Sequence, residues 1–273
     1  MMKALVVIPA RYGSTRLPGK ALVEIKGKPL IQHVYENACR SRLAEKTIVA
    51  TDDERILVAV TAFGGEAVMT SSSHPSGTDR IAEVVRGQPC DIVVNLQGDE
   101  PMIRPEMIDD VISILLEDER ADMGTLIKPI DTVEEALNPN VVKAVIDRHG
   151  YAMYFSRSPI PYYRDLFAMK PAKASGSDHV FQFSCPDDTY RFLKHIGIYS
   201  YRRDILLQLT DLPPSDLEIA ERLEQLRALQ HGFRIKVRET PYDTVGVDTA
   251  EDLELIKSLM ERKDRGGHVQ PQE

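Results

Sequence analysis

Short apolar runs alternate along the first part of the chain with segments whose apolar residues recur at helical spacing. The first run, ALVVI at residues 4–8, is β-branched and apolar on both alternating faces, which is typical of a strand buried inside a parallel sheet. Further strands are predicted at 47–50, 66–69 and 91–96, and helices at 29–42, 79–86 and 105–117, with capping residues at 51–54 opening another helix that ends at 64–65. This repeated β-α order predicts an α/β fold.

The rhythm changes past residue 121. Residues 141–146 and 151–155 flank the dipeptide His149-Gly150, a spacing that predicts a hairpin, and a substrate-covering subdomain could begin there. Residues 162–188 are polar and irregular, which is typical of a functional loop, a mobile loop or an interface. Beyond them we expect a strand at 195–201, one long helix at 215–230, a strand at 234–238, a helix from 249 and a frayed tail at 266–273.

Composition narrows the class of protein. With 42% hydrophobic and 28% charged residues among 273, the chain can bury a full core. Its net charge of -8 argues against general binding to nucleic acid or anionic lipid. There is no signal-peptide pattern and no apolar run long enough to cross a bilayer. The three cysteines are far apart and fit neither a metal site nor a disulfide framework, which favours a reducing cytoplasm.

The segment PARYGSTRLPGK, residues 9–20, follows the first strand directly. Three cations lie within it, Arg11, Arg16 and Lys20, and two glycines let the backbone turn closely around an anion. A polyphosphate fits this pattern better than a merely solvated loop, because proline and glycine constrain the backbone. The segment is not a Walker A loop, since five residues separate its glycines and Ala21 follows the lysine.

Two acidic residues could take part in the chemistry. Asp99 stands just beyond the end of a predicted buried strand, where open α/β sheets collect ligands, so it is a candidate Mg²⁺ ligand alongside substrate phosphates. Asp248 precedes the last helix, and by local pattern Asp248 or Thr249 is expected to cap that helix. Arg80 lies in the first turn of a predicted helix, where a cation needs an anionic partner, and a nucleotide could be that partner.

Other polar residues carry less information alone. His74 and His179 form no nucleophile-base pattern with a serine or cysteine, so a hydrolase triad is not expected. His195 and Tyr199 share one face of a predicted strand, and Glu224 and Gln225 fall in a predicted helix. By themselves these four residues indicate ordinary packing or solvation.

Seven separated motifs taken together are far more specific. They are PARYGSTRLPGK (9–20), SGTDR (76–80), NLQGDEP (95–101), YFSRSPIP (154–161), HIGIY (195–199), LEQLR (223–227) and GVD (246–248). In this order they resemble the 3-deoxy-manno-octulosonate cytidylyltransferase family over nearly the whole chain. The sugar acid of that family is called Kdo.

The resemblance implies a Rossmann-like, mostly parallel nucleotidyltransferase sheet flanked by helices, with a smaller antiparallel subdomain for substrate binding or dimerisation. One domain would span 1–265, with a nucleotide-binding core at 1–130 and 230–265 and an insertion at 131–229. The enzyme would join CTP to Kdo, releasing pyrophosphate and forming CMP-Kdo for lipopolysaccharide synthesis. It would use Mg²⁺ and act as a homodimer.

The resemblance also assigns site residues. It implies that the nucleotide is held by a set that belongs to the first three motifs: Arg11, Ser14, Arg16, Lys20, Ser76, Gly77, Arg80 and Gln97. It implies that the sugar acid is held by Gln97, Arg157, His195, Tyr199, Glu224 and Gln225. Asp99 and Asp248 match the magnesium carboxylates, which overrides the capping interpretation of Asp248, and Lys20, Arg16 and Asp99 are the expected catalytic groups.

Two alternatives stay open at this level. The sequence departs from the common family pattern at Ile219 and Ala220 and after Tyr162, which leaves the fine contacts to the sugar and the closure of the loop open. Among enzymes, the nearest alternative is a cytidylyltransferase that acts on a different keto-acid sugar, such as sialic acid or an 8-amino Kdo analogue. A nucleotide-sensing protein without turnover is the alternative from another class, although Lys20, Asp99 and Asp248 weigh against it. In the enzyme, the anomeric hydroxyl of Kdo is expected to attack the α-phosphorus of CTP without a protein base.

Overall fold

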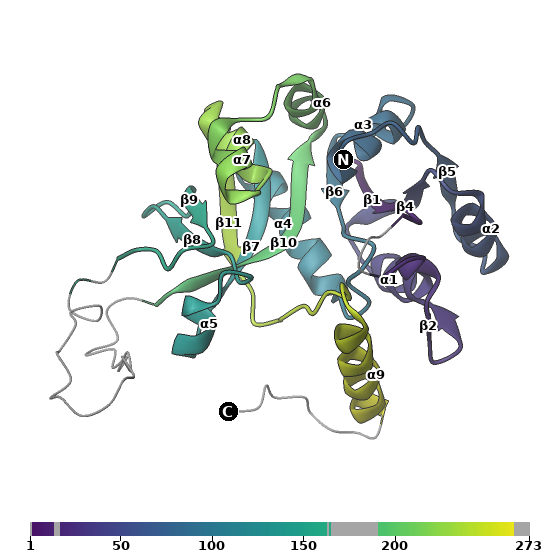
Figure 1. The fold of residues 1–273 in the computed structure, drawn as a ribbon. Coiled ribbons are helices and arrows are strands. Elements are labelled where there is room, and N and C mark those ends of the chain that lie inside the picture. The colour runs from purple at the N-terminus through teal and green to yellow at the C-terminus, as the bar shows by residue number, and fades with distance from the viewer. Residues whose placement is uncertain (1, 14–16, 163, 165–190, 265–273) are drawn as a thin grey trace, which may run out of the picture.

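The protein folds around one twisted sheet, shown in Figure 1. A computed structural model describes residues 2–13, 17–162, 164 and 191–264. The sheet order is β11-β7-β10-β6-β1-β4-β5, with β8 and β9 added at β10. Its strands are β1 (Ala4–Ala10), β4 (Ala44–Thr51), β5 (Ala67–Met69), β6 (Ile92–Asn95), β7 (Met123–Pro129), β8 (Lys143–Ile146), β9 (Ala152–Ser156), β10 (Leu193–Arg202) and β11 (Ile235–Glu239). A separate hairpin joins β2 (Glu24–Ile25) and β3 (Lys28–Pro29).

Helices cover both faces of the sheet, because each central strand buries both of its alternating side-chain rows. Val6 and Ile8 of β1 face one core with α1 (Leu30–Ala38), α2 (Glu54–Ala62), α4 (Pro105–Glu117) and α9 (Ala250–Asp264). Leu5 and Val7 face the other core with α3 (Gly77–Arg86), α6 (Arg203–Asp211) and α8 (Gln225–Gln230). The remaining helices are η1 (Lys20–Leu22), α5 (Val133–Leu137) and α7 (Asp216–Glu221). Figure 1 shows α9 lying beside the β2–β3 hairpin, so the last described helix returns to the N-terminal part of the chain.

The strand directions confirm the predicted mostly parallel α/β sheet. Strand β1 pairs in parallel with β4 and β6, and β4–β5 and β7–β11 are parallel too. Strand β10 is antiparallel to both of its neighbours, β6 and β7, and it also pairs with β8 of the small antiparallel extension. Although β10 falls by sequence within the predicted insertion 131–229, it lies inside the main sheet.

One predicted element is wrong, since residues 215–230 do not form one long helix. Helix α7 ends at Glu221, Arg222 takes the left-handed conformation with φ 55°, and α8 begins at Gln225. The turn brings Arg227 back to Glu218, with Nε 2.7 Å and Nη2 2.6 Å from its two carboxylate oxygens. In one straight helix these residues would stand roughly 13 Å apart. This ion pair, of a buried arginine and a half-buried glutamate, therefore requires the break between α7 and α8.

The remaining expectations have mixed outcomes. The hairpin prediction is confirmed by the antiparallel pair β8–β9. Strand β7 and helix α6 were not predicted, and α6 follows β10 directly with no side-chain cap to announce it. The polar segment 162–188 and the tail 266–273 lie almost wholly or wholly outside the described residues. Among the described residues, every helix falls short of the length and apolar content that a membrane crossing requires.

Candidate active site

The predicted phosphate loop leaves β1 and closes on itself before η1. The Gly19 N–H donates to the Tyr12 carbonyl at 3.1 Å, and Gly19 has φ 68°, a conformation that glycine adopts without steric cost. The Tyr12 ring packs against Gly19, and the Arg55 guanidinium of α2 lies 3.3 Å from the centre of that ring. The loop is therefore braced from a neighbouring helix. Ser14 and Arg16, both predicted here, lie outside the described residues.

Lys20 lies between the two predicted acidic residues. Its Nζ is 2.6 Å from Asp99 Oδ2 and 2.9 Å from Asp248 Oδ1. Burial by itself would lower the pKa of Lys20, but the two carboxylates more than offset that effect and raise the pKa. The Val247 N–H donates to the Asp99 carbonyl at 2.9 Å, which fixes the two acidic segments together. Side chains 149 positions apart in sequence thus share one place in the structure.

The side chain of Asp248 does not cap helix α9, because other residues do. Thr249 Oγ1 accepts from the Asp252 N–H at 3.2 Å, and Asp252 Oδ2 accepts from the N–H groups of Asp248 and Thr249. Of the two caps expected from the local pattern, Thr249 is therefore the one that forms. The Asp248 side chain turns to Lys20 instead.

A cavity of about 320 Å³ opens where these residues meet. The predicted nucleotide and metal residues that line it are Arg11, Lys20, Ser76, Gly77, Arg80, Gln97, Asp99 and Asp248. Ser76 also caps α3, since its Oγ accepts from the Asp79 N–H at 3.2 Å. The cavity therefore joins the ends of β1 and β6, the start of α3 and the segment before α9.

Arg80 has an anionic partner within the protein. Its Nη2 lies 2.8 Å from Asp52 Oδ2, and its Nη1 donates to Thr70 Oγ1 at 2.5 Å. The need for an anion near the start of α3 is thus met by Asp52, which follows β4, and does not require a nucleotide. Arg80 still lines the cavity.

A second cavity of about 250 Å³ adjoins the first, because Gly77 and Gln97 line both. Besides Gln97, three predicted sugar residues line it: Tyr199 on β10, and Glu224 and Gln225 at the start of α8. Burial raises the pKa of Glu224, although Thr78 Oγ1 donates to its carboxylate. The buried Tyr199 hydroxyl has no hydrogen-bond partner among the described residues. This cavity thus presents polar groups that a hydroxyl-rich ligand would satisfy.

Two predicted sugar residues do not line either cavity. Arg157 donates from Nε to the Glu221 carbonyl at 2.8 Å and from Nη1 to the Pro139 carbonyl at 3.1 Å. His195 lies behind Tyr199, with ring centres 5.2 Å apart, and its Nε2 is 3.0 Å from Thr125 Oγ1. Burial lowers the pKa of His195 to about 3, so its ring is neutral near pH 7.

Sequence reasoning missed several cavity residues. Thr78, Asn95 and Tyr201 line the second cavity, and His74 lines the first. Thr78 and Asn95 lie inside recognised motifs, so the motifs themselves could have identified them. Tyr201 follows Tyr199 at strand alternation. His74 has its partner, Glu83, on α3, and no sequence spacing indicates that pair.

The site offers two carboxylates to a hard cation. No group of three or more His, Cys, Asp or Glu side chains suited to a metal ion occurs among the residues that the structure describes. Asp99 and Asp248 nevertheless converge on a single atom of Lys20, within 2.9 Å. Mg²⁺ commonly takes one or two carboxylates together with substrate phosphates and water. The donor set therefore fits Mg²⁺ brought with a nucleotide.

A family profile described as Cytidylyltransferase matches residues 5–237. The chain belongs to the cytidylyltransferase family. It is 52% identical to the 3-deoxy-manno-octulosonate cytidylyltransferase of Geotalea daltonii over 265 residues, covering 97% of this chain and 100% of that protein. It is 49% identical to the protein of the same name from Geobacter sulfurreducens, covering 93% and 98% of the two chains. These relatives confirm the resemblance carried by the seven motifs.

Solved cytidylyltransferases share the fold. A structure of CMP:2-keto-3-deoxy-manno-octonic acid synthetase complexed with CTP matches with a TM-score of 0.85 and 45% identity, covering 96% of this chain and 99% of the other. A cytidylyltransferase from Leptospira borgpetersenii matches with a TM-score of 0.59 at 17% identity, which supports the fold alone. Within this fold, the first cavity lies at the loops that follow β1 and β6, and the second lies between the end of β6, β10 and the start of α8.

Proposed function

We propose that this chain is a CTP-dependent cytidylyltransferase that activates Kdo, giving CMP-Kdo and pyrophosphate. The observation that carries the proposal is the junction of two cavities at Gly77 and Gln97. The first has Lys20 beside two carboxylates, as a triphosphate site needs, and the second is lined by hydroxyl, amide and carboxylate groups. Two substrates held side by side react as if at very high concentration.

The reaction is an in-line displacement at the α-phosphorus of CTP. The anomeric hydroxyl of Kdo releases its proton to solvent as its oxygen forms the new bond to the α-phosphorus, and the bond from that phosphorus to the oxygen shared with the β-phosphate breaks to release pyrophosphate. Lys20 moves from Asp99 and Asp248 to the phosphates, where it offsets negative charge together with Arg11. Gln97 lies where the two cavities meet and orients both substrates.

We also propose that Mg²⁺ is the resident cofactor. Asp99 and Asp248 would hold it, and it would polarise the α-phosphate and lower the pKa of the attacking hydroxyl. The convergence of the two carboxylates supports this proposal.

A homodimer in the cytoplasm is the proposed state of the enzyme. Met153 on β9 and Ile219 on α7 are exposed apolar side chains that a second copy could cover. Both described cysteines are free thiols, which suits a reducing compartment. Light scattering at two protein concentrations tests the dimer, and cell fractionation tests the compartment.

Pyrophosphate release tests the activity directly. Protein is incubated with CTP, Mg²⁺ and Kdo, then with each component omitted, and then with sialic acid or 8-amino Kdo in place of Kdo. We expect release only in the complete mixture and fastest release with Kdo. Faster release with another sugar would change the substrate assignment. CTP binding without pyrophosphate release from any sugar would instead indicate a nucleotide-binding protein.

A further inference from the structure

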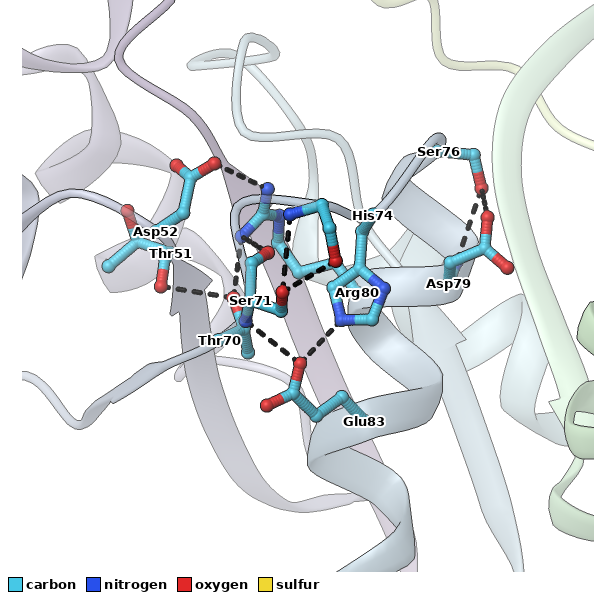
Figure 2. Close-up of polar contacts among 10 residues, drawn as sticks. Thr51, Asp52, Thr70, Ser71, His74, Ser76, Asp79, Arg80 and Glu83 are labelled. Atoms are coloured by element: carbon cyan, nitrogen blue, oxygen red, sulfur yellow. Dashed lines mark hydrogen bonds and ion pairs between the residues drawn. The ribbon is translucent and has the colours of Figure 1, made fainter.

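The loop between β5 and α3 is held by two charged side chains of α3. Arg80 Nη1 donates to the Ser71 carbonyl at 3.4 Å as well as to Thr70, and Glu83 Oε2 accepts from the Ser71 N–H at 3.0 Å. Both backbone polar groups of Ser71 are thus bound from one helix, as Figure 2 shows. The loop that forms one wall of the nucleotide cavity is therefore fixed before any ligand arrives.

The same carboxylate oxygen of Glu83 also contacts His74 Nε2 (Figure 2). A backbone N–H can only donate, so this oxygen acts as an acceptor toward Ser71. The hydrogen bond from the Ser71 N–H is the largest cause that lowers the pKa of Glu83, and the hydrogen bond from His74 is the next. The carboxylate of Glu83 therefore stays ionised. An ionised carboxylate has no proton to give, so His74 Nε2 must carry the hydrogen of this bond.

In the neutral ring, that assignment determines what the other nitrogen can do. When Nε2 carries the hydrogen of a neutral imidazole, Nδ1 has a free lone pair and is an acceptor. Nδ1 forms no hydrogen bond within the described part of the chain, and Figure 2 shows it turned away from Glu83. The His74 side chain is 19% exposed and lines the nucleotide cavity. The wall of the cavity thus includes a neutral imidazole whose one lone pair is not used within the described part of the chain.

We propose that His74 Nδ1 accepts a hydrogen bond from the exocyclic amino group of cytosine, and that Glu83 is the positioning residue that sets this tautomer. The proposal rests on the proposed use of CTP. With the phosphates against Lys20, the base reaches the wall formed by residues 74–77 of the same cavity. Cytosine presents an amino donor at position 4, whereas uracil presents a carbonyl acceptor there. A fixed acceptor therefore selects CTP over UTP.

Three variants separate base recognition from loop support. His74→Gln keeps an N–H donor for Glu83 and removes the group at the Nδ1 position. Glu83→Gln can place an amide oxygen where Oε2 accepts both bonds, and Glu83→Met removes both. The matched control is His33→Gln, because His33 Nε2 also binds one protein oxygen, the Ile25 carbonyl at 2.8 Å, away from the cavity.

Calorimetric titration with Mg·CTP and Mg·UTP gives the affinity ratio for each variant, and urea unfolding reports the fold. For His74→Gln we expect CTP affinity to fall about tenfold and UTP affinity to change less than about threefold, with unfolding unchanged. Glu83→Gln and His33→Gln should keep the wild-type ratio. Glu83→Met should lose part of the preference for CTP over UTP, and its KM for CTP should rise more than its kcat falls.

The titrations distinguish failure of the base-recognition proposal from failure of the proposed function. If wild-type protein binds no CTP, the function itself is wrong. If it binds CTP and His74→Gln keeps the wild-type CTP:UTP ratio, His74 does not read the base. An equal loss of both affinities in His74→Gln would show that the histidine only supports the loop, and would also overturn the inference.

Discussion

Removing the ammonium of Lys20 should make the nucleotide-free protein bind a divalent cation more tightly. Lys20 Nζ lies 2.6 Å from Asp99 and 2.9 Å from Asp248, and its side chain is only 17% exposed. A metal ion that used both carboxylates would have to share this space with the ammonium or displace it. Lys20→Met keeps an unbranched side chain, shorter by one atom, and removes its charge.

The size of the effect follows from the distances. Ligand oxygens lie about 2.1 Å from Mg²⁺, so an ion between the carboxylates would stand about 4 Å from Nζ. A double and a single positive charge at that separation repel by about 2 kcal/mol even at the dielectric constant of water. Loss of the ammonium also leaves two carboxylates facing each other, which acts in the same direction. We therefore expect binding about 30-fold tighter.

The assay is a calorimetric titration with Mn²⁺, which accepts the same oxygen ligands as Mg²⁺, in the absence of nucleotide. Lys28→Met is the matched control, since Lys28 pairs with Glu36 at 2.7 Å on a surface that does not line the cavity. Wild-type protein and the control should bind Mn²⁺ with similar, weak affinity. If Lys20→Met binds Mn²⁺ no more tightly than Lys28→Met, Lys20 does not compete with the metal and the reasoning fails.

Three further changes have expected outcomes. Asp99→Asn should lower kcat for pyrophosphate release at least about 100-fold, equivalent to about 3 kcal/mol, whereas the exposed Asp204→Asn should not; equal rates would remove Asp99 from the site. Lys143→Met should lower the free energy of unfolding, measured in urea, by about 3 kcal/mol. The reason is that the buried Lys143 Nζ donates to three backbone carbonyls, which would lose their partner. An unchanged urea midpoint would contradict this. The pKa of His195 is lowered to about 3 in the folded state, so as the pH falls the histidine takes up a proton in the unfolded chain first. The free energy of unfolding of the wild type should therefore drop by about 1 kcal/mol from pH 7 to 5.5. An equal drop in His195→Gln would show that His195 does not cause it.

The sequence was informative wherever burial follows a short period. Helix α4 is found at Pro105–Glu117, the range expected from its apolar spacing, and β1 and β6 lie side by side inside the sheet. Strand β7 was missed although most of it is buried, because Gly124 and Thr125 interrupt the apolar run. Periodicity in the sequence shows only which residues are buried. Strand β7 exists because β10 and β11 pair with it, and this pairing is not visible in the sequence of β7 itself.

For the candidate site, the motifs supplied the residue types and the family, but not the partners. No spacing rule links Arg80 to Asp52 or Glu83 to His74 across the loop, and none places Arg157 against the Glu221 carbonyl. Such pairs form between side chains brought together by packing. Sequence reasoning could therefore give the members of the site and not their contacts.

The sequence by itself determined the β-α order from β1 to α4, the departure from the Walker A spacing and the chemical character of the loops, because these depend on residue type and local spacing. Only the tertiary structure decided that α7 and α8 are separate, that β10 runs antiparallel inside the sheet, and that Lys20 stands between Asp99 and Asp248. These features bring distant parts of one chain together. Bringing these parts together costs the conformational entropy of closing long loops. That cost is offset by the burial of apolar side chains, which is complete only when the whole sheet has assembled.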